Sequence, residues 1–358
     1  MNLNLPMLRP LRILLFPFSL LYALAIILRN WLFDKHILST TSFNLPVICI
    51  GNLAVGGTGK SPMVEFLIKK LSGQFQVAVL SRGYKRKTRG YALANETSTA
   101  LDIGDEPMQF HSKFPKVTIA VGEERVFAIP QLLHDHPDTR TIILDDAFQH
   151  RSVKAGLNIL LTDYSNLFTR DWYLPSGDLR DEKRSYKRSE LIVVTKCKPH
   201  FSEKERQEII KEINPLPSQE IFFSTIQYGN IYHIVNKNSI KIKHDMEVLL
   251  VAGIANPSPL KKWLELLCKS YDEISYSDHH IFSIDDLENM INRFETMDTN
   301  HKIILTTEKD AVRLVKFQQE LIKWPFYVVP IETVFLFDGE RAITDLIIKF
   351  ITEFTSPG

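Results

Sequence analysis

The sequence predicts an α/β protein with a mainly parallel β-sheet that helices cover on both faces, followed by a smaller C-terminal α/β lobe. Short apolar runs rich in β-branched residues alternate with helical patterns along most of the 358 residues, and this alternation is typical of parallel sheets. A glycine-rich loop joins the first such run to the first helical pattern. An uncharged apolar segment precedes both, which predicts a separate N-terminal helix.

The composition is that of an ordinary globular protein. Apolar residues make up 44% of the chain and the net charge is +1, so nothing indicates a nucleic-acid partner. A chain of this length usually forms more than one core, which predicts two domains. Cys49, Cys197 and Cys268 are far apart and form no CxxC pair. They predict reduced thiols and no zinc site. The sequence indicates no oligomer.

The N-terminal segment Ile13–Leu28 contains no charged residue. A bilayer span needs roughly 20 apolar residues, so this segment reaches that length only by including Trp31–Phe33 or by snorkelling its flanking arginines. A signal peptide is disfavoured because no small-residue cleavage site follows. A buried helix of a soluble domain is an alternative. We favour a membrane anchor over residues 1–36, with interfacial and spanning placements both open.

The core is expected over residues 37–200. Its predicted strands are Val47–Ile50, Val77–Leu80, Val117–Val121, Thr141–Leu144, Asn158–Leu161 and Leu191–Thr195, and its predicted helices include Met63–Leu71 and Arg125–Leu133. In open sheets of this kind, ligands bind beyond the carboxyl ends of the strands. The motifs described below follow such ends.

The smaller lobe is expected over residues 201–358, with a weak boundary near Pro199. Its predicted elements are the helices Lys204–Ile213 and Pro259–Lys269 and the strands Ile221–Thr225, Ile231–Val235, Val248–Ala252, Ile303–Thr306 and Phe326–Val329. This mixture is again α/β.

The glycine-rich loop lies between the first predicted strand and a helical pattern that begins at Lys60-Ser61. Strand, glycine loop, Lys-Ser and helix is the context of a phosphate-binding P-loop, so the fold is predicted to be P-loop NTPase-like. Backbone N–H groups and the helix N-terminus would surround phosphate oxygens, Lys60 would reach the β and γ phosphates, and Ser61 would bind Mg²⁺. The predicted ATP-binding residues are Ala54, Val55, Gly56, Gly57, Thr58, Gly59, Lys60 and Ser61.

An acidic strand end supplies the second half of such a site. Asp145 and Asp146 directly follow the apolar run Thr141–Leu144, and Gln149 and His150 come next. A carboxylate at this place binds Mg²⁺ or its waters. The alternative, a strand exit with solvated carboxylates, loses weight beside a P-loop.

Phosphoryl transfer to a hydroxyl also needs a group that accepts its proton. Two clusters qualify, Asp105-Glu106 with Arg125 farther along, and Asp278-His279-His280 in the second block. An Asp–His pair could close over an acceptor from two lobes, but composition alone does not choose between the candidates.

Two basic loops complete the set of candidates. Ser81–Arg89 holds five cations around Tyr84 and suits an anionic substrate or anionic lipid headgroups, or is a solvated loop. Arg180, followed by Asp181, comes after a Pro/Gly turn and is either a phosphate clamp or part of a surface turn.

Taken together, these motifs resemble the tetraacyldisaccharide 4′-kinase family, the lipid A 4′-kinases of Gram-negative bacteria. The resemblance covers nearly the whole chain. It runs through GNLAVGGTGKSP, LSRGYKR, GDEP, VGEER, LDDAFQHR, LPSGDLR, VAGIANP, DHH and TTEKDAVR. The family's loop also lacks glycine at the place of Ala54, so this departure from the general P-loop pattern supports the resemblance.

The resemblance implies an enzyme that moves the γ-phosphate of ATP, with Mg²⁺, to the 4′-hydroxyl of a tetraacylated glucosamine disaccharide 1-phosphate. It also implies the bacterial inner membrane, with the catalytic part on the cytoplasmic face. Its catalytic residues would be Asp105 as the base, His279 as its partner, and Lys60. Its metal-side residues would be Ser61, Asp145, Asp146 and Asp181, and its site-lining residues Tyr84, Glu106, Arg125, Gln149, His150 and Arg180.

Three departures from the family pattern stand out. Ala147 occupies a place where many relatives have glycine, Ser61 replaces threonine but keeps the hydroxyl, and Asp181 replaces glutamate. The shorter carboxylate weakens the expectation that Asp181 serves the metal.

Two other classes of protein compete with a lipid kinase. A P-loop GTPase or ATPase switch usually has Asn/Thr-Lys-x-Asp after a later strand, whereas the best match here, Thr195–Lys198, lacks the aspartate. A non-enzymatic, membrane-bound nucleotide-binding module is the second. Fast nucleotide hydrolysis without a sugar-lipid acceptor would favour the GTPase or ATPase switch. Function in cells that survives Asp105→Asn would favour the binding module.

Overall fold

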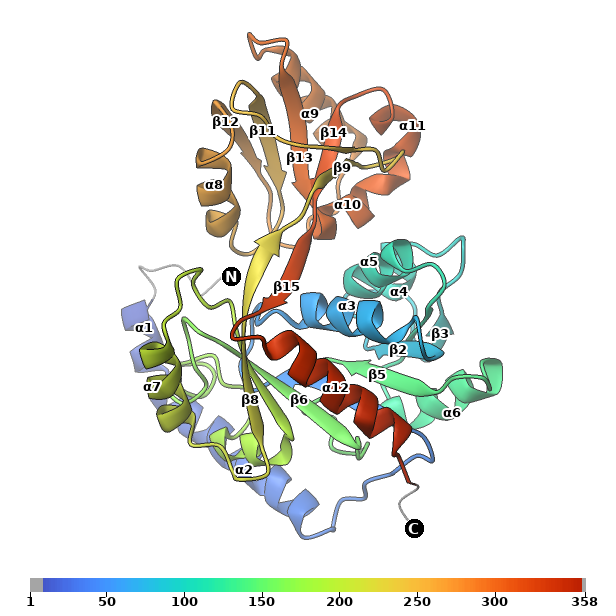
Figure 1. Ribbon diagram of the computed structural model, residues 1–358, viewed down its shortest axis with the longest axis vertical. Coiled ribbons are helices and arrows are strands. Elements are labelled where there is room, and N and C mark those ends of the chain that lie inside the picture. The colour runs from blue at the N-terminus through green and yellow to red at the C-terminus, as the bar shows by residue number, and fades with distance from the viewer. Residues whose placement is uncertain (1–8, 356–358) are drawn as a thin grey trace.

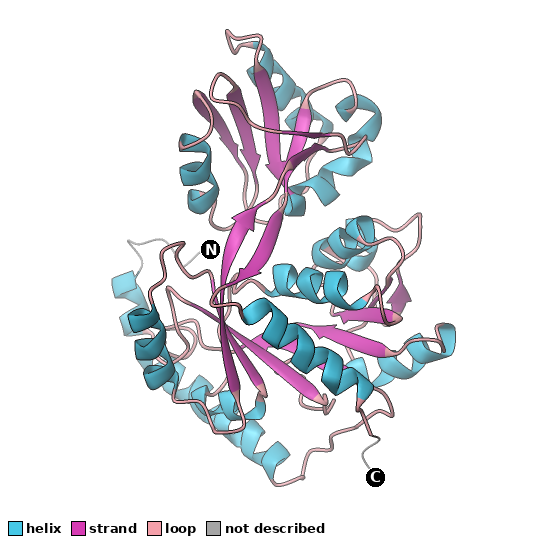
Figure 2. Cartoon of the chain, viewed as in Figure 1, coloured by secondary structure: helices cyan, strands magenta, loops and turns pink. Residues whose placement is uncertain are grey.

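The computed structural model describes residues 9–355, so the first eight residues of the predicted anchor lie outside the described part. The chain forms a larger lobe and a smaller lobe, connected by two neighbouring strands (Figure 1). Each lobe is a β-sheet with helices on both faces (Figure 2). The predicted α/β fold class is confirmed.

The large sheet contains nine strands in the spatial order β15-β8-β7-β6-β1-β5-β2-β4-β3. From β8 to β4 all neighbours are parallel, and β15 and β3 are antiparallel edge strands. The strands are β1 (Val47–Asn52), β2 (Val77–Ser81), β3 (Ala92–Leu93), β4 (Thr118–Val121), β5 (Thr141–Asp145), β6 (Leu157–Asp163), β7 (Leu191–Thr195), β8 (Glu220–Tyr228) and β15 (Ile331–Phe335).

Two apolar layers enclose this sheet because side chains alternate along each strand. Ile48 and Ile50 of β1 pack with α3 and α12 on one face, whereas Val47 and Cys49 pack toward α6 and α7 on the other. The helices of this lobe are α3 (Lys60–Leu71), α4 (Ala100–Ile103), α5 (Asp105–Lys113), α6 (Arg125–Asp135), the 3₁₀ helix η2 (Lys183–Arg188), α7 (Glu203–Ile213) and α12 (Gly339–Thr352).

The small sheet has the order β10-β9-β14-β13-β11-β12, with β9 and β10 antiparallel and the others parallel. Its strands are β9 (Ile231–His233), β10 (Ser239–Ile240), β11 (Glu247–Ala252), β12 (Ser270–Ser275), β13 (Lys302–Thr307) and β14 (Phe326–Val329). Its helices are α8 (Ser258–Glu265), α9 (Ile284–Glu295), α10 (Glu308–Leu314), the 3₁₀ helix η3 (Val315–Phe317) and α11 (Gln318–Leu321).

Local signals fix several helix starts. Ser202 caps α7 and Ser283 caps α9, each in a reciprocal capping box with the residue three positions on. Such boxes satisfy two backbone donors that a helix N-terminus otherwise leaves unpaired.

The boundary expected near residue 200 differs from the sheet membership. Helix α7 and strand β8 follow that boundary but belong to the large lobe, and the chain returns to the large sheet at β15 and α12. Strands β8 and β15 pair with each other, Ser224 opposite Phe335 and Tyr228 opposite Ile331. The small lobe is therefore an insertion of about residues 231–329 between two paired strands, an arrangement that local sequence patterns do not reveal.

Two helices precede the first strand, α1 (Arg9–Leu14) and α2 (Phe16–Asp34). In the described part of the chain, α2 is the one helix that is long and apolar enough to cross a bilayer by length and composition. It runs along the outside of the large lobe (Figure 1), and only 22% of its most apolar window is buried.

Candidate active site

The glycine-rich loop is at the carboxyl end of β1 and leads directly into α3. Gly56 and Gly59 have φ angles of +105° and +84°, values that residues with a Cβ rarely adopt. Gly59 caps α3, so Lys60 and Ser61 form its first turn. The predicted ATP-binding residues therefore form one continuous loop at a helix N-terminus, where free N–H groups and the helix dipole favour phosphate.

Neighbouring strands hold the backbone of this loop. Thr195 at the end of β7 donates a hydrogen bond of 2.8 Å to the Thr58 carbonyl, and the Lys196 ammonium donates to the Gly57 carbonyl. Lys196 also pairs with Asp163 at 2.8 Å. Because the run Thr195–Lys198 lacks the aspartate of a guanine-reading motif, sequence reasoning set it aside. Thr195 and Lys196 nevertheless hold the backbone of the phosphate loop.

Asp145 and Asp146 differ in environment although they are adjacent. Asp145 is 1% exposed, and burial, followed by the nearby Glu106 and Asp146 carboxylates, raises its pKa to about 7. Burial alone would also raise the pKa of Asp146, but the charges of Lys60 and Arg180 outweigh it and lower that pKa. Asp146 therefore stays ionised between the P-loop lysine, at 3.8 Å, and the Arg180 guanidinium.

The residues around Asp145 fit a Mg²⁺ ion. Its Oδ2 accepts from Ser81 at 3.0 Å, whereas its buried Oδ1 has no partner among residues 9–355. Ser61 donates to Glu106 at 2.8 Å, so a hydroxyl and a second carboxylate belong to the same centre. Mg²⁺ binds one or two carboxylates together with phosphates and waters, and this donor set suits that pattern. No group of three or more acidic, His or Cys side chains arranged for a metal occurs in the described chain.

Asp105 and His279 come together from the two lobes. Asp105 is the first residue of α5 and His279 lies in the loop after β12, yet His279 Nδ1 is 2.7 Å from Asp105 Oδ2. His279 adopts a left-handed φ of +63°, and its ring reaches Asp105 of the large lobe. An aspartate polarised by an imidazole is suited to receive a proton from a hydroxyl.

Arg313 of α10 supports this pair from behind. Its guanidinium lies 3.5 Å from Asp105 Oδ2 and donates to the His280 carbonyl at 2.8 Å. It also pairs with the fully buried Asp310. The motif TTEKDAVR, which carries part of the family resemblance, thus fixes the turn that presents His279.

The other predicted lining residues surround the acidic centre. Arg125 is 1% exposed, and burial lowers its pKa to about 10, so it remains a cation that donates to the Asp145 carbonyl at 3.2 Å. Burial, together with Arg125 and Arg82, lowers the pKa of His150 to about 4, so this imidazole is neutral at pH 7. The buried Gln149 Oε1 has no partner within the described residues.

The structure does not bring Asp181 to the acidic centre. Its side chain is 1% exposed, and its two oxygens accept five hydrogen bonds or ion pairs inside the large lobe. The donors are the side chains of Asn30, Gln149, Ser185 and Arg188 and the backbone N–H of Glu182. These contacts leave no open oxygen for a metal, which disagrees with the metal-side role expected from the resemblance.

Tyr84 and the basic loop form the outer part of the site. The Tyr84 ring is exposed and lies edge-on to His279, with centroids 5.8 Å apart. The loop Arg82–Arg89 and Glu123 line a cavity of about 390 Å³. Arg86 is not a free cation of this loop, because its buried guanidinium pairs with Glu123 at 2.7 Å and donates to the Gly90 carbonyl.

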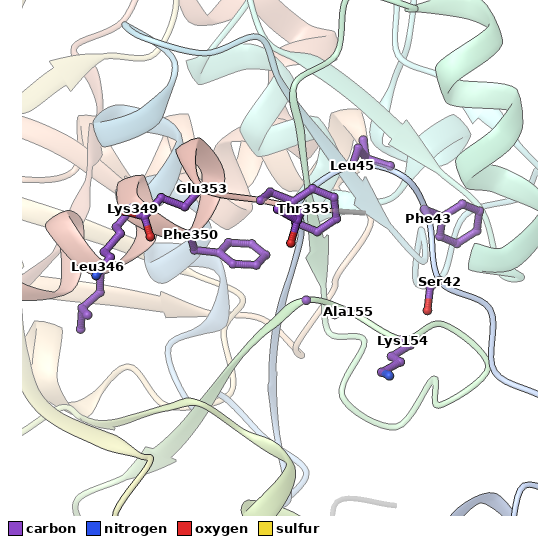
Figure 3. A pocket seen from close by; sticks show the side chains of 12 residues that line it. Ser42, Phe43, Leu45, Lys154, Ala155, Leu346, Lys349, Phe350, Glu353 and Thr355 are labelled. Carbon is purple, nitrogen blue, oxygen red and sulfur yellow. The ribbon is translucent and has the colours of Figure 1, made fainter. Parts of the chain in front are cut away.

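A second cavity, of about 500 Å³, lies at the opposite, amino-terminal edge of the large sheet. Figure 3 shows Phe43 and Leu45, which precede β1, across from Phe350 and Glu353 of the C-terminal helix region. It contains none of the predicted site residues.

The fold and the site define a P-loop nucleotide-binding protein whose second lobe places His279 against Asp105 of the first. The family model described as Tetraacyldisaccharide-1-P 4′-kinase matches residues 11–351, and the chain belongs to this family.

Individual relatives agree with this assignment. Proteins named tetraacyldisaccharide 4′-kinase are 45% identical in Flavobacterium johnsoniae, over 97% of this chain and 99% of theirs, and 44% identical in Bacteroides thetaiotaomicron, over 95% and 93%. The crystal structure of LpxK from Aquifex aeolicus in complex with ATP is similar with a TM-score of 0.74 and 26% identity, covering 95% of this chain and 99% of that one.

Proposed function

We propose that this protein transfers the γ-phosphate of ATP to the 4′-hydroxyl of a tetraacylated glucosamine disaccharide 1-phosphate. Family membership supports the reaction, and the P-loop facing an Asp–His pair across the two lobes carries the structural argument. A phosphate donor held at α3 and a hydroxyl held at Asp105 would meet between the lobes, which is the arrangement that in-line phosphoryl transfer requires.

In this mechanism the P-loop amides and Lys60 bind the β and γ phosphates and neutralise the charge that develops during transfer. Mg²⁺, when bound, would be held by Ser61, Asp145 and Asp146, with Glu106 beside Ser61, and would neutralise phosphate oxygens. The open Oδ1 of Asp145 supports this placement.

Asp105 accepts the proton of the 4′-hydroxyl as that oxygen forms its bond to the γ-phosphorus, while the bond from the γ-phosphorus to the β–γ bridging oxygen breaks and ADP leaves. His279, hydrogen-bonded to the carboxylate, orients it and stabilises the pair when the proton arrives. Arg180 and Arg125 lie on the phosphate side of the centre, and the neutral His150 and the open Gln149 amide oxygen offer hydrogen bonds. Tyr84, exposed beside His279, is the aromatic side chain that we assign to the sugar.

We further propose that α2 rests in the membrane interface. Its outer face exposes large apolar side chains, whereas its inner face contacts the large lobe: Leu20, Leu21, Leu24, Leu28 and Trp31 point outward, and Ser19, Ala23, Asn30 and Phe33 are buried. A helix with one apolar face free and the other on the protein lies in the plane of the interface. The acyl chains of the substrate hold it in the same plane, and the bacterial inner membrane is the expected location, with the catalytic lobes on the cytoplasmic side.

The deciding experiment is phosphate transfer from ATP to the disaccharide 1-phosphate in detergent, comparing the wild type with Lys60→Ala. Product with wild type and its loss in the variant are expected. Rapid ATP hydrolysis without the acceptor would instead favour an ATPase switch, and no product with wild type would overturn the proposed reaction.

The basic loop is tested separately, because its role in binding headgroups or the substrate's 1-phosphate is a further proposal. Charge reversal belongs at the exposed Lys85, Lys87 and Arg89, since the Arg86 side chain is buried against Glu123. Weaker binding to anionic vesicles and a higher KM for the lipid are expected. Unchanged values for both would remove the loop from the site.

A further inference from the structure

Helix α2 is mainly apolar but buries two polar side chains. Ser19 and Asn30 are each 3% exposed and lie on the face that contacts the large lobe. A helix that served only as a membrane anchor would have no need of buried polar groups, because each costs free energy unless it is hydrogen-bonded. Their partners therefore indicate what this face of the helix does.

The Asn30 side chain binds the Asp181 carboxylate. Its amide Nδ2 donates to Asp181 Oδ1 at 2.9 Å and approaches Ser185 Oγ at 3.4 Å. Asp181 passes this connection to the catalytic centre, because its Oδ2 accepts from Gln149 Nε2 at 3.3 Å. The same Gln149 amide donates to the Asn52 carbonyl at the end of β1, at 2.8 Å.

Two further side chains of α2 donate hydrogen bonds to backbone carbonyls of the same segments. The Tyr22 hydroxyl donates to the Arg180 carbonyl at 3.1 Å, and Arg29 donates to the Gln149 carbonyl at 2.7 Å. The Arg180 side chain in turn pairs with Asp146. Three side chains from one face of α2 thus reach the residues that flank the phosphate loop and the acidic centre.

We propose that α2 is a wall of the catalytic centre as well as its membrane contact, with Asn30 as a positioning residue that acts through Asp181 on Gln149. The proposal rests on the proposed function. The proposal also favours the interfacial placement of α2 over the spanning one. If α2 left the protein to span a bilayer, Asn30 would lose its hydrogen bond to Asp181.

The test separates the two faces of the helix. Asn30→Leu removes the amide at nearly constant volume, Trp31→Ser removes an exposed side chain of the outer face, and Asn44→Leu makes the same chemical change at an exposed position. Each variant is assayed for transfer in detergent and for binding to vesicles of phosphatidylethanolamine and phosphatidylglycerol.

Asn30→Leu is expected to lower kcat in detergent by roughly tenfold or more, since small displacements of positioned groups have effects of this size. Its vesicle binding should match wild type. Trp31→Ser should weaken vesicle binding, and Asn44→Leu should change neither. In the Asn30→Leu/Asp181→Asn double variant the two losses in kcat should not add, because both changes act on one connection.

The proposal would be overturned if Asn30→Leu kept wild-type kcat per folded protein, with or without a loss of vesicle binding, or if the losses in the double variant were additive. Hydrogen exchange gives a readout independent of the substrate. In Asn30→Leu the backbone amides of residues 180–188 should exchange faster than in wild type. An unchanged exchange rate would refute the proposal that α2 holds this segment in place. A wild type inactive on the disaccharide but with this exchange pattern would instead refute the proposed reaction alone.

Discussion

His279 Nδ1 lies 2.7 Å from Asp105 Oδ2 although the two residues are 174 positions apart. One stands at the start of α5 in the large lobe, and the other in a turn of the inserted lobe. The hydrogen bond between them therefore forms only when the two lobes are correctly placed relative to each other. In the proposed mechanism, this contact makes the placement of the small lobe a condition for phosphoryl transfer at the P-loop.

Replacing Asp105 with asparagine should remove the proton acceptor and leave the nucleotide site intact. Because a positioned base contributes roughly 10²- to 10⁴-fold, we expect kcat for 4′-phosphorylation to fall by about that factor, with ATP affinity retained. Single-turnover transfer and equilibrium nucleotide binding measure the two quantities. Asp102→Asn, at the third residue of α4 in the capping box with Thr99, is the matched control. Full activity of Asp105→Asn would assign the base elsewhere.

The large-lobe fold was accessible from sequence because its strands are continuous apolar runs. β1, β2, β5, β6 and β7 are buried along most of their length, as parallel strands covered on both faces must be. Strand β12, Ser270–Ser275, has mostly half-buried residues and was missed. Strand β15 was missed as well, because its sheet partner β8 is distant in the chain.

The site was predicted where chemistry follows a strand end, as at Lys60 and Asp145. The partnership of Asp105 with His279 was expected from the resemblance, while the residues alone left it open, because only the tertiary fold sets a distance across an insertion. Arg313 had no local signal apart from its motif. Asp181 shows the converse: its sequence position suggested the metal, but the fold surrounds it with donors.

Arg313→Gln tests whether α10 sets the geometry of the catalytic pair. Losing the guanidinium should free the His280 carbonyl and leave the buried Asp310 without its cation. We expect roughly a tenfold to hundredfold lower kcat, and a free energy of unfolding lower by about 3 kcal/mol, the size seen when one partner of a buried pair is removed. Steady-state kinetics and chemical denaturation measure them.

Arg313→Lys keeps the charge and should recover part of kcat. Arg293→Gln, at an exposed ion pair with Asp272 of the same lobe, should leave both quantities near wild type. A loss of stability in Arg313→Gln with wild-type kcat per folded molecule would reduce Arg313 to a structural role.

Gly104 immediately precedes Asp105, the proposed base, and has a φ of +94°. A Cβ there would lie 3.1 Å from the Tyr84 carbonyl oxygen and 3.2 Å from the Gly83 backbone. Gly104→Ala should therefore cost roughly 1–3 kcal/mol of stability and displace Asp105, lowering kcat. Thermal unfolding and transfer assays report both. Gly73→Ala has open space around it and should be neutral, so equal behaviour of the two variants would contradict this explanation.

A buried ionic cluster joins three elements behind the catalytic pair. Lys113 at the end of α5 lies 2.6 Å from Glu65 of α3 and 2.6 Å from Glu308 of α10, and Gln109 donates to Glu65 at 2.7 Å. One ammonium faces two buried carboxylates. Burial and the charge of Glu308 outweigh Lys113 and raise the pKa of Glu65 to about 7.

This raised pKa predicts how stability depends on pH. The folded protein binds a proton at Glu65 more tightly than the unfolded chain, whose pKa is near 4.5. The free energy of unfolding should therefore fall as pH rises from about 4.5 to about 7 and then level off for this group. In Glu65→Gln, which keeps the hydrogen-bonding shape without the charge, this part of the slope should vanish.

Denaturant unfolding of both proteins between about pH 4.5 and pH 8 gives the difference, which cancels the other titrating groups. Between low pH and pH 7 or above, the free energy of unfolding should fall less in the variant than in the wild type. Glu332→Gln, at an exposed pair with Lys69 and with a lowered pKa, should leave the wild-type slope in this range. If Glu65→Gln and wild type had parallel pH profiles, the carboxylate of Glu65 would be ionised throughout and Lys113 would satisfy both acids.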